Sequence, residues 1–262
     1  MSDYRRPALL GSSFAAGPGI APILDRAAGR SARNYGRLVA ERLGARLTDL
    51  SVSGATTETL LDQPQRVLIK KFSPQLDGLP ADADLVMITA GGNDLDYIGT
   101  LSRLAVDGRL RSNRLLGRLV RRRQRPTVVL PSDEDAERAI TGLVRVVTAV
   151  RDRAPGARIL LVDYPILIGD DAGTGPELPI EPDQLGQARQ LGERLITVFG
   201  TAAERSGAEL VAVSAPGRDH GIGSARPWVN GFRTRSGDGD RFHPNAAGMR
   251  ASADLIMERL AS

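Results

Sequence analysis

The sequence predicts an α/β fold in which a parallel sheet is covered by helices on both faces. Three observations predict it. Short apolar segments without polar–apolar alternation recur along the chain, as expected of strands buried on both faces. Amphipathic stretches of helical length separate these segments, and turn residues lie at the junctions. This alternation of strand and helix is typical of a parallel sheet with helical crossovers.

Each predicted strand is short, rich in Val, Ile or Leu, and followed by turn residues. The five strands cover residues 8–10, 46–52, 85–89, 158–162 and 209–213. Because successive strands are joined by helices rather than by tight turns, we expect them to run parallel.

Four amphipathic stretches predict the helices, and their ends carry the expected capping residues. They cover residues 32–43, 133–153, 183–206 and 245–260. Gly44 and Gly207 follow the first and third stretches, where a left-handed residue commonly ends a helix. Ser132 precedes the second as an N-cap, and Pro244 precedes the fourth.

The chain of 262 residues is predicted to form a single domain over residues 1–262, because it contains no repeat and no long linker. Three insertions interrupt the pattern near residues 95–131, 165–182 and 216–239. In open parallel sheets, ligands bind outside the carboxyl ends of the strands, where such loops meet.

Composition excludes several classes of protein. The chain has no cysteine, so disulfides and thiolate metal sites are excluded, and its two histidines make a multi-histidine metal site improbable on composition. Aromatic residues make up only 4%, which argues against base-stacking surfaces for nucleic acid. The N-terminus has no apolar signal segment and no stretch is long enough to cross a membrane, so we expect a cytoplasmic protein, or a secreted one if the sequence has been trimmed.

A serine follows the first predicted strand, in the stretch Gly11-Ser12-Ser13-Phe14. A serine at a tight turn after a strand can expose its hydroxyl, and the backbone N–H groups that follow can face an oxyanion. Serine and glycine also favour ordinary turns, so this motif alone is weak.

Two further polar groups follow the second and third predicted strands. Gly54 can bring a backbone N–H close to a ligand, although it also suits a plain turn. Asn93, after Gly91-Gly92, can offer its side-chain NH₂ to an oxyanion, although an Asn-Asp pair can also cap a helix.

A histidine lies near the C-terminus, in the stretch Asp240-Arg241-Phe242-His243-Pro244. The spacing lets Asp240 bind one ring nitrogen of His243 while the other nitrogen faces the serine. The alternative is an exposed loop histidine. Taken together, Ser13, Gly54, Asn93 and His243 fall in order at the expected functional edge of the sheet, and each supplies a role that acyl transfer needs.

These residues resemble the four blocks of the SGNH hydrolases, also called GDSL-type esterases and lipases. The matching blocks are Gly11-Ser12-Ser13-Phe14, Gly54, Gly91-Gly92-Asn93-Asp94 and Asp240-Arg241-Phe242-His243-Pro244. The resemblance implies a three-layer α/β/α, flavodoxin-like fold with a five-stranded parallel sheet. It also implies Ser13 as nucleophile, Asp240 and His243 as the rest of the triad, and no metal or organic cofactor. Ser13 N–H, Gly54 N–H and Asn93 would form the oxyanion hole.

The chain departs from the family pattern at Ser12, where an aspartate is usual. Ser12 is therefore the alternative nucleophile to Ser13. The leading prediction is a serine-dependent ester hydrolase of the esterase or lipase type acting on a small-molecule acyl ester. Sugar O-acetyl esterase, lysophospholipase and thioesterase activities use the same site. A ligand-binding module with a weakened site is the alternative of another class.

Other residues are weaker candidates. Phe14, His220 and Trp228 are possible substrate-pocket residues, with His220 also a rival base and Trp228 more simply packed behind the histidine loop. The arginine-rich run 119–125 suits a solvated surface better than a nucleic-acid site, and no nucleic acid is expected as a partner. The sequence does not define the oligomeric state.

Overall fold

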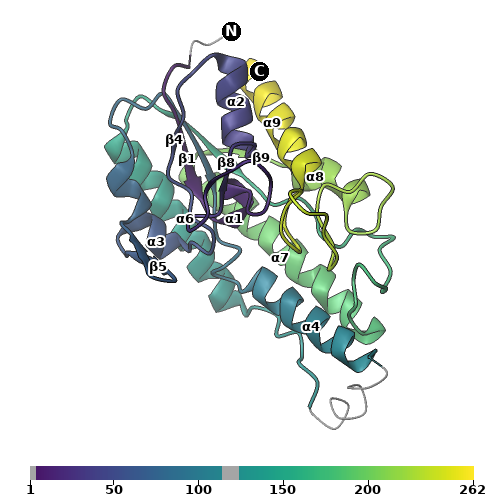
Figure 1. Cartoon of the computed structure of the whole chain (residues 1–262). Coiled ribbons are helices and arrows are strands. Elements are labelled where there is room, and N and C mark those ends of the chain that lie inside the picture. The colour runs from purple at the N-terminus through teal and green to yellow at the C-terminus, as the bar shows by residue number, and fades with distance from the viewer. Residues whose placement is uncertain (1–3, 114–123) are drawn as a thin grey trace.

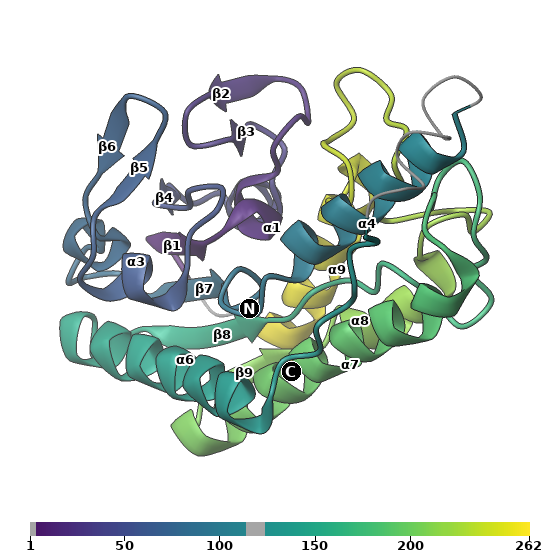
Figure 2. The ribbon, with the colours of Figure 1, turned by 90° about the horizontal axis from the view of Figure 1, so that it is seen from below.

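The computed structural model describes residues 4–113 and 124–262. Its centre is a parallel sheet of five strands (Figure 1). Their order across the sheet is β4-β1-β7-β8-β9 (Figure 2). The strands are β1 (Pro7–Gly11), β4 (Thr48–Asp49), β7 (Leu85–Thr89), β8 (Arg158–Val162) and β9 (Glu209–Val211). The predicted α/β fold with a five-stranded parallel sheet is confirmed.

Two predicted strands are shorter in the structure than in the sequence analysis. The strand expected at 46–52 ends at Asp49, because the Asp49 carboxylate accepts hydrogen bonds from the Ser51 N–H and hydroxyl at 3.2 and 2.6 Å and turns the chain. The strand expected at 209–213 ends at Val211, because Ser214 begins the short helix α8 (Ser214–Gly217) and donates its N–H to Asp163 at 2.9 Å.

Helices cover both faces of the sheet, and alternate strand residues show which helices cover which face. Leu9 and Met87 pack in one core cluster with residues of α2 (Tyr35–Leu43) and α9 (Ala246–Ala261). Leu10 and Ile88 pack in the other with residues of α3 (Thr57–Leu61), α4 (Tyr97–Arg111), α6 (Asp133–Arg153) and α7 (Pro182–Ser206). The result is three layers, with α2 beside α9 on one side (Figure 1).

The four predicted helices are present, with small shifts at their ends. The helix expected from residue 32 begins at Tyr35, because the Asn34 side chain caps it by accepting the Arg37 N–H at 3.0 Å. Helix α6 has the predicted bounds, and Ser132 forms a capping box with Asp135.

Several short elements were not predicted. They are the short helices α3 and α8, α1 (Ser13–Ala16), the 3₁₀ turns η1 (Gln75–Gly78) and η2 (Arg218–His220), and two hairpins, β2 (Ile23–Asp25) with β3 (Arg30–Ser31) and β5 (Gln65–Val67) with β6 (Lys70–Phe72). Both hairpins project beyond the β4 edge of the sheet (Figure 2). Helix α4 occupies the start of the insertion near 95–131, and residues 119–123 of the arginine-rich run lie outside the described residues. Within the described part of the chain, no helix is both long and apolar enough to span a membrane.

Candidate active site

The turn after β1 is fixed by the neighbouring strand β7. Gly11 has φ +146°, and a Cβ atom there would lie 2.2 Å from the carbonyl oxygen of Thr89, so only glycine fits. The Ser12 N–H donates to the same carbonyl at 2.8 Å. Ser13 then becomes the first residue of α1, and the chain leaves the helix at Gly17 in the left-handed conformation.

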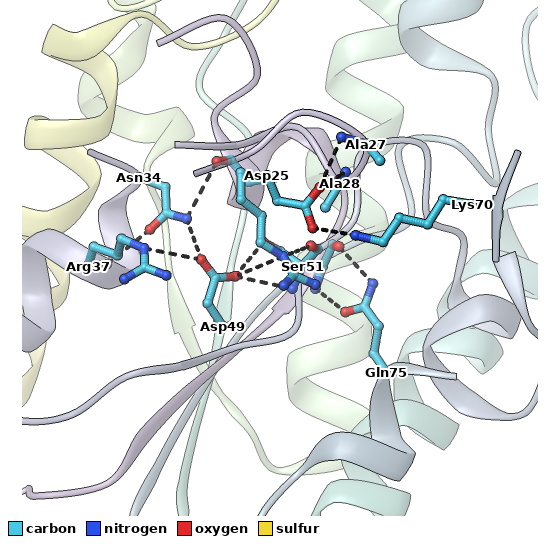
Figure 3. Close-up of polar contacts among 12 residues, drawn as sticks. Asp25, Ala27, Ala28, Asn34, Arg37, Asp49, Ser51, Lys70 and Gln75 are labelled. Atoms are coloured by element: carbon cyan, nitrogen blue, oxygen red, sulfur yellow. Dashed lines mark hydrogen bonds and ion pairs between the residues drawn. The ribbon is translucent and has the colours of Figure 1, made fainter. Parts of the chain in front are cut away.

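The side chain of Gln75 holds the other edge of this turn. Its Oε1 accepts the Gly11 N–H at 2.8 Å, and its Nε2 donates to the Gly11 carbonyl at 3.0 Å (Figure 3). Gln75 is 4% exposed. The Gly11 carbonyl also accepts the Val52 N–H at 3.0 Å, whereas the Gly11 N–H is bonded to the Gln75 side chain, which therefore supplies the acceptor that this buried donor needs.

The structure separates the two candidate serines. The Ser13 Oγ lies 2.9 Å from Nε2 of His243. The Ser12 Oγ lies 3.1 Å from the hydroxyl of Tyr164, and the Gly92 N–H donates to that hydroxyl at 3.2 Å. Ser12, 1% exposed, is therefore part of a buried polar contact, and Ser13 is the serine placed against the histidine.

The loop that carries His243 is held by backbone hydrogen bonds to another loop. The Phe242 N–H donates to the Asn230 carbonyl at 3.1 Å, and the Asn230 N–H donates to the His243 carbonyl at 2.9 Å. Phe242 has φ +57°, an unfavourable conformation for an aromatic residue, and its side chain is buried. After Pro244, the Asn245 side chain caps α9 by accepting the Gly248 N–H at 2.9 Å.

The second ring nitrogen of His243 does not have the predicted partner. Nδ1 lies 2.7 Å from the carbonyl oxygen of Arg241, and the expected hydrogen bond from Nδ1 to the Asp240 carboxylate is wrong for this structure. A carbonyl oxygen can only accept, so Nδ1 carries the proton and Nε2 presents its lone pair to Ser13. The chain turns back on itself within two residues here, which brings a main-chain oxygen closer than the carboxylate.

The surroundings of His243 lower the pKa of its imidazole below the ordinary value of 6.5. Burial is the main cause, because it disfavours the charged form. The hydrogen bond to the Arg241 carbonyl and the negative charge of Asp240 act in the opposite direction. Asp240 thus acts on His243 through its charge.

The candidate oxyanion donors come from three adjacent strands, because β4, β1 and β7 are neighbours in the sheet. Ser13 follows β1, Gly54 follows β4, and Asn93 follows β7. Within the described part of the chain, the Ser13 and Gly54 N–H groups have no acceptor. Asn93 donates one Nδ2 hydrogen to the Ala55 carbonyl at 2.8 Å, which leaves a second hydrogen for a ligand.

The Asp94 carboxylate links the loop after β7, which carries Asn93, to the loop after β4, which carries Gly54. It accepts the Thr57 N–H at 3.1 Å and the Thr57 hydroxyl at 2.5 Å, at the start of α3. Burial raises the pKa of Asp94, and the two hydrogen bonds from Thr57 oppose that rise. The sequence analysis missed this contact, since nothing in a local motif pairs residues 37 positions apart.

The three possible pocket residues lie in two places. The Phe14 ring lies 5.3 Å from the His243 ring and 4.3 Å from the Tyr164 ring, so Phe14 forms part of the wall behind the histidine. His220 stacks on Trp228 at 4.3 Å, and both line a separate hollow of about 1040 Å³. Neither Ser13 nor His243 is among the described residues that line this hollow. Trp228 also supports the histidine loop, because its carbonyl accepts the Asn245 N–H at 2.9 Å.

Two kinds of group meet at the site. The Ser13 hydroxyl faces the lone pair of His243 Nε2, and a side-chain amide and backbone N–H groups supply donors that suit a developing oxyanion. Over residues 4–113 and 124–262, no group of three or more His, Asp or Glu side chains is placed to hold a metal ion.

Comparison with known proteins agrees with this geometry. The model of the GDSL-like Lipase/Acylhydrolase family matches residues 9–251. Lipase 2 of Streptomyces coelicolor is 29% identical, over 96% of this chain and 84% of the relative, and the lipase of Streptomyces rimosus is 26% identical, over 91% and 80%.

Solved structures show the same fold. An extracellular lipase from Streptomyces rimosus superposes with a TM-score of 0.72 at 20% identity, covering 97% of this chain and 99% of the other. A phospholipase A1 from Streptomyces albidoflavus NA297 gives 0.72 at 19% identity, with the same coverage. Because the family model spans nearly the whole chain, the chain belongs to the GDSL-like lipase/acylhydrolase family and is a serine ester hydrolase.

Proposed function

We propose that the chain hydrolyses acyl esters of lipids through an acyl-enzyme formed on Ser13. The observation that carries the proposal is the 2.9 Å contact between the Ser13 Oγ and Nε2 of His243, on the tautomer that leaves Nε2 free to take a proton. The two Streptomyces relatives in sequence are named lipases, and one of the solved structures with the same fold is a phospholipase A1, which supports lipid esters as the substrate class.

The first half of the reaction forms the acyl-enzyme. His243 accepts the hydroxyl proton as the Ser13 Oγ attacks the ester carbonyl carbon. The Ser13 N–H, Gly54 N–H and Asn93 side chain hold the oxyanion of the tetrahedral intermediate. When this intermediate collapses, the ester C–O bond breaks, and His243 returns the proton to the leaving alcohol.

The second half releases the acid. Water loses a proton to His243 and attacks the acyl carbonyl, and the same donors hold the second oxyanion. Collapse breaks the bond to Ser13 Oγ, and the proton returns to the serine. Throughout, the Arg241 carbonyl keeps the imidazole in the Nδ1–H form.

The test compares two neighbouring serines. Ser13→Ala should reduce kcat for a nitrophenyl ester by about 10⁴-fold or more, and labelling by a serine-directed organophosphonate should be lost. Ser12→Ala is the matched control and should retain labelling, because Ser12 contacts Tyr164 rather than His243. Full activity in Ser13→Ala, or loss of labelling only in Ser12→Ala, would contradict the proposal.

The partner of Nδ1 is tested separately. In triads where a carboxylate accepts from Nδ1, its conversion to an amide lowers kcat by roughly 10⁴-fold. We expect Asp240→Asn to lower kcat/KM by less than about 10-fold, because the Arg241 carbonyl accepts from Nδ1 at 2.7 Å. A loss near 10⁴-fold would restore Asp240 to the role that the sequence predicted.

The cytoplasmic location expected from the sequence remains a prediction.

A further inference from the structure

The tip of the β5–β6 hairpin exposes two large apolar side chains. Leu68 is 92% exposed and Ile69 is 99% exposed, the two highest values among the large hydrophobic residues described. Because both side chains stay in contact with water, neither contributes hydrophobic free energy to the folding of a monomer. The hairpin tip is therefore built for something outside the chain.

The backbone at the tip strengthens this argument. Leu68 has φ +54°, the left-handed conformation that glycine and asparagine adopt readily and that disfavours a leucine. The tip thus keeps an apolar side chain at a position where folding alone favours a small or polar residue.

Exposed basic residues lie on the same hairpin as the two apolar side chains and on the neighbouring hairpin. Arg66 and Lys71 are exposed on the two strands of the hairpin, and Arg26 is exposed in the turn of the neighbouring β2–β3 hairpin. Within the described part of the chain, none of these three has a carboxylate at salt-bridge distance. The chain has only two lysines, at positions 70 and 71, and both lie on this hairpin.

The two hairpins form one surface. Lys70 Nζ donates to the Asp25 carboxylate at 2.8 Å, and the other oxygen of Asp25 accepts the Ala27 and Ala28 N–H groups (Figure 3). The hairpins lie side by side beyond the β4 edge (Figure 2). Leu24 of β2, 54% exposed, adds a third apolar side chain.

The base of the β5–β6 hairpin touches the candidate oxyanion loop. Gln65 Nε2 donates to the Ser53 carbonyl at 2.8 Å, and a Cβ at Gly54 would lie 3.4 Å from the same nitrogen. With about 3.3 Å per strand residue, the apolar tip lies roughly 10 Å from this loop along β5. A surface bound at the tip is therefore close to the site where an ester would be cleaved.

We propose that the tip of the β5–β6 hairpin docks this enzyme on an anionic lipid surface. Leu68 and Ile69 would enter the acyl boundary, while Arg66 and Lys71 contact lipid phosphates and carboxylates. An apolar tip beside cations without a carboxylate partner matches the two layers of such a surface. The acyl boundary takes the apolar side chains, and the anionic headgroups take the cations. The inference rests on the proposed lipid-ester hydrolysis for its purpose, but the docking is measurable without catalysis.

Binding is measured on the Ser13→Ala protein by co-sedimentation with vesicles of phosphatidylcholine containing phosphatidylserine. The added change Leu68→Gly with Ile69→Ser should weaken partitioning by about 100-fold or more, because two apolar side chains no longer leave water. Glycine suits the positive φ of residue 68, so the hairpin should still form. Arg66→Gln with Lys71→Gln should weaken partitioning by roughly 30-fold at low salt, and less at high salt.

Two controls separate docking from other effects. Val129→Ser removes an apolar residue that is 75% exposed in the segment before α6, and it should leave vesicle binding unchanged. In the enzyme with Ser13 intact, the hairpin variant should hydrolyse a soluble short-chain nitrophenyl ester at the normal rate, and a general loss there would point to misfolding.

The proposal is overturned if the Ser13→Ala protein does not bind phosphatidylserine vesicles, or binds them equally well with and without the tip residues. It is also overturned if the tip substitutions instead convert a dimer to a monomer in sedimentation equilibrium, since the occupant would then be a second copy of the chain. Loss of esterase activity in Ser13→Ala bears only on the proposed reaction, so the two can fail separately.

Discussion

The two halves of the Ser13–His243 pair are held in different ways. The serine turn is part of the sheet, because Ser12 bonds to β7 and the Gln75 amide closes the other side of Gly11. The histidine sits on a loop that is held mainly by backbone hydrogen bonds to Asn230, another loop residue. The nucleophile position is therefore set by the core of the fold, and the base position by the pairing of two loops.

This difference implies different tolerance to substitution. A change in the serine turn leaves buried backbone groups such as the Gly11 N–H without a hydrogen-bond partner, and each such loss lowers the free energy of unfolding. A change in the histidine loop affects contacts that solvent can partly replace. The following substitutions test that contrast, beginning with the largest effect.

The largest effect is expected at Gly11. Gly11→Ala places a Cβ 2.2 Å from the Thr89 carbonyl at φ +146°, so β1 and β7 must separate. We expect a loss of at least about 3 kcal/mol in the free energy of unfolding, measured by urea denaturation. Gly44→Ala is the control, because Gly44 also has a positive φ, +61°, but nothing lies within 4 Å of its Cβ position. Its cost should be about 1 kcal/mol, and equal costs for the two variants would contradict the argument.

The next effect is expected at Gln75. Gln75→Leu leaves the Gly11 N–H buried without its acceptor, and we expect a loss of about 2 kcal/mol in stability together with a lower kcat. Gln190→Leu, at an exposed position on α7, should change stability by less than about 0.5 kcal/mol. A Gln75→Leu protein with normal stability and normal kcat would show that the sheet holds the turn without this amide.

A smaller effect is expected on the histidine side, at Asn230. Its side chain donates to the Asp238 carbonyl at 2.8 Å and, more weakly, to the Asp240 carbonyl at 3.4 Å. Asn230→Ala removes both contacts but keeps the backbone pairing with Phe242 and His243, so about 1 kcal/mol of stability should be lost. A loss that exceeds the one in Gln75→Leu would reverse the contrast between the two halves.

The same contrast explains how far the sequence could predict the site. Ser13, Gly54, Asn93 and His243 could be proposed from the sequence because each occupies a short motif next to a predicted element. The partner of Nδ1 could not be found this way. Every residue has a carbonyl oxygen, so a main-chain acceptor such as that of Arg241 has no signature in the sequence.

Gln75 and the β5–β6 hairpin were missed for related reasons. The contact between Gln75 and Gly11 joins residues 64 positions apart, and a lone glutamine before a turn gives no hint of it. The hairpin was missed because its turn carries Leu68 at φ +54°, where the usual signal is glycine or asparagine. In both cases the local sequence pattern does not predict the feature, because tertiary contacts or function, rather than conformational propensity, determine which residue occupies the position.

The smallest effect is expected in the pH dependence of the histidine half. His243 must be neutral to accept the Ser13 proton, so kcat/KM falls as the pH drops through the pKa of the free enzyme. Burial lowers that pKa, so the acid limb should have its midpoint below 6.5.

The negative charge of Asp240 raises the pKa of His243, and Asp240→Asn should therefore move the midpoint to lower pH by a fraction of a unit. The pH profile of kcat/KM for a soluble nitrophenyl ester measures both midpoints, and Glu58→Gln, at an exposed position on α3, is the charge-matched control. A shift to higher pH in Asp240→Asn would mean that loss of the carboxylate changes the hydrogen bonding of the ring and not only its electrostatic surroundings.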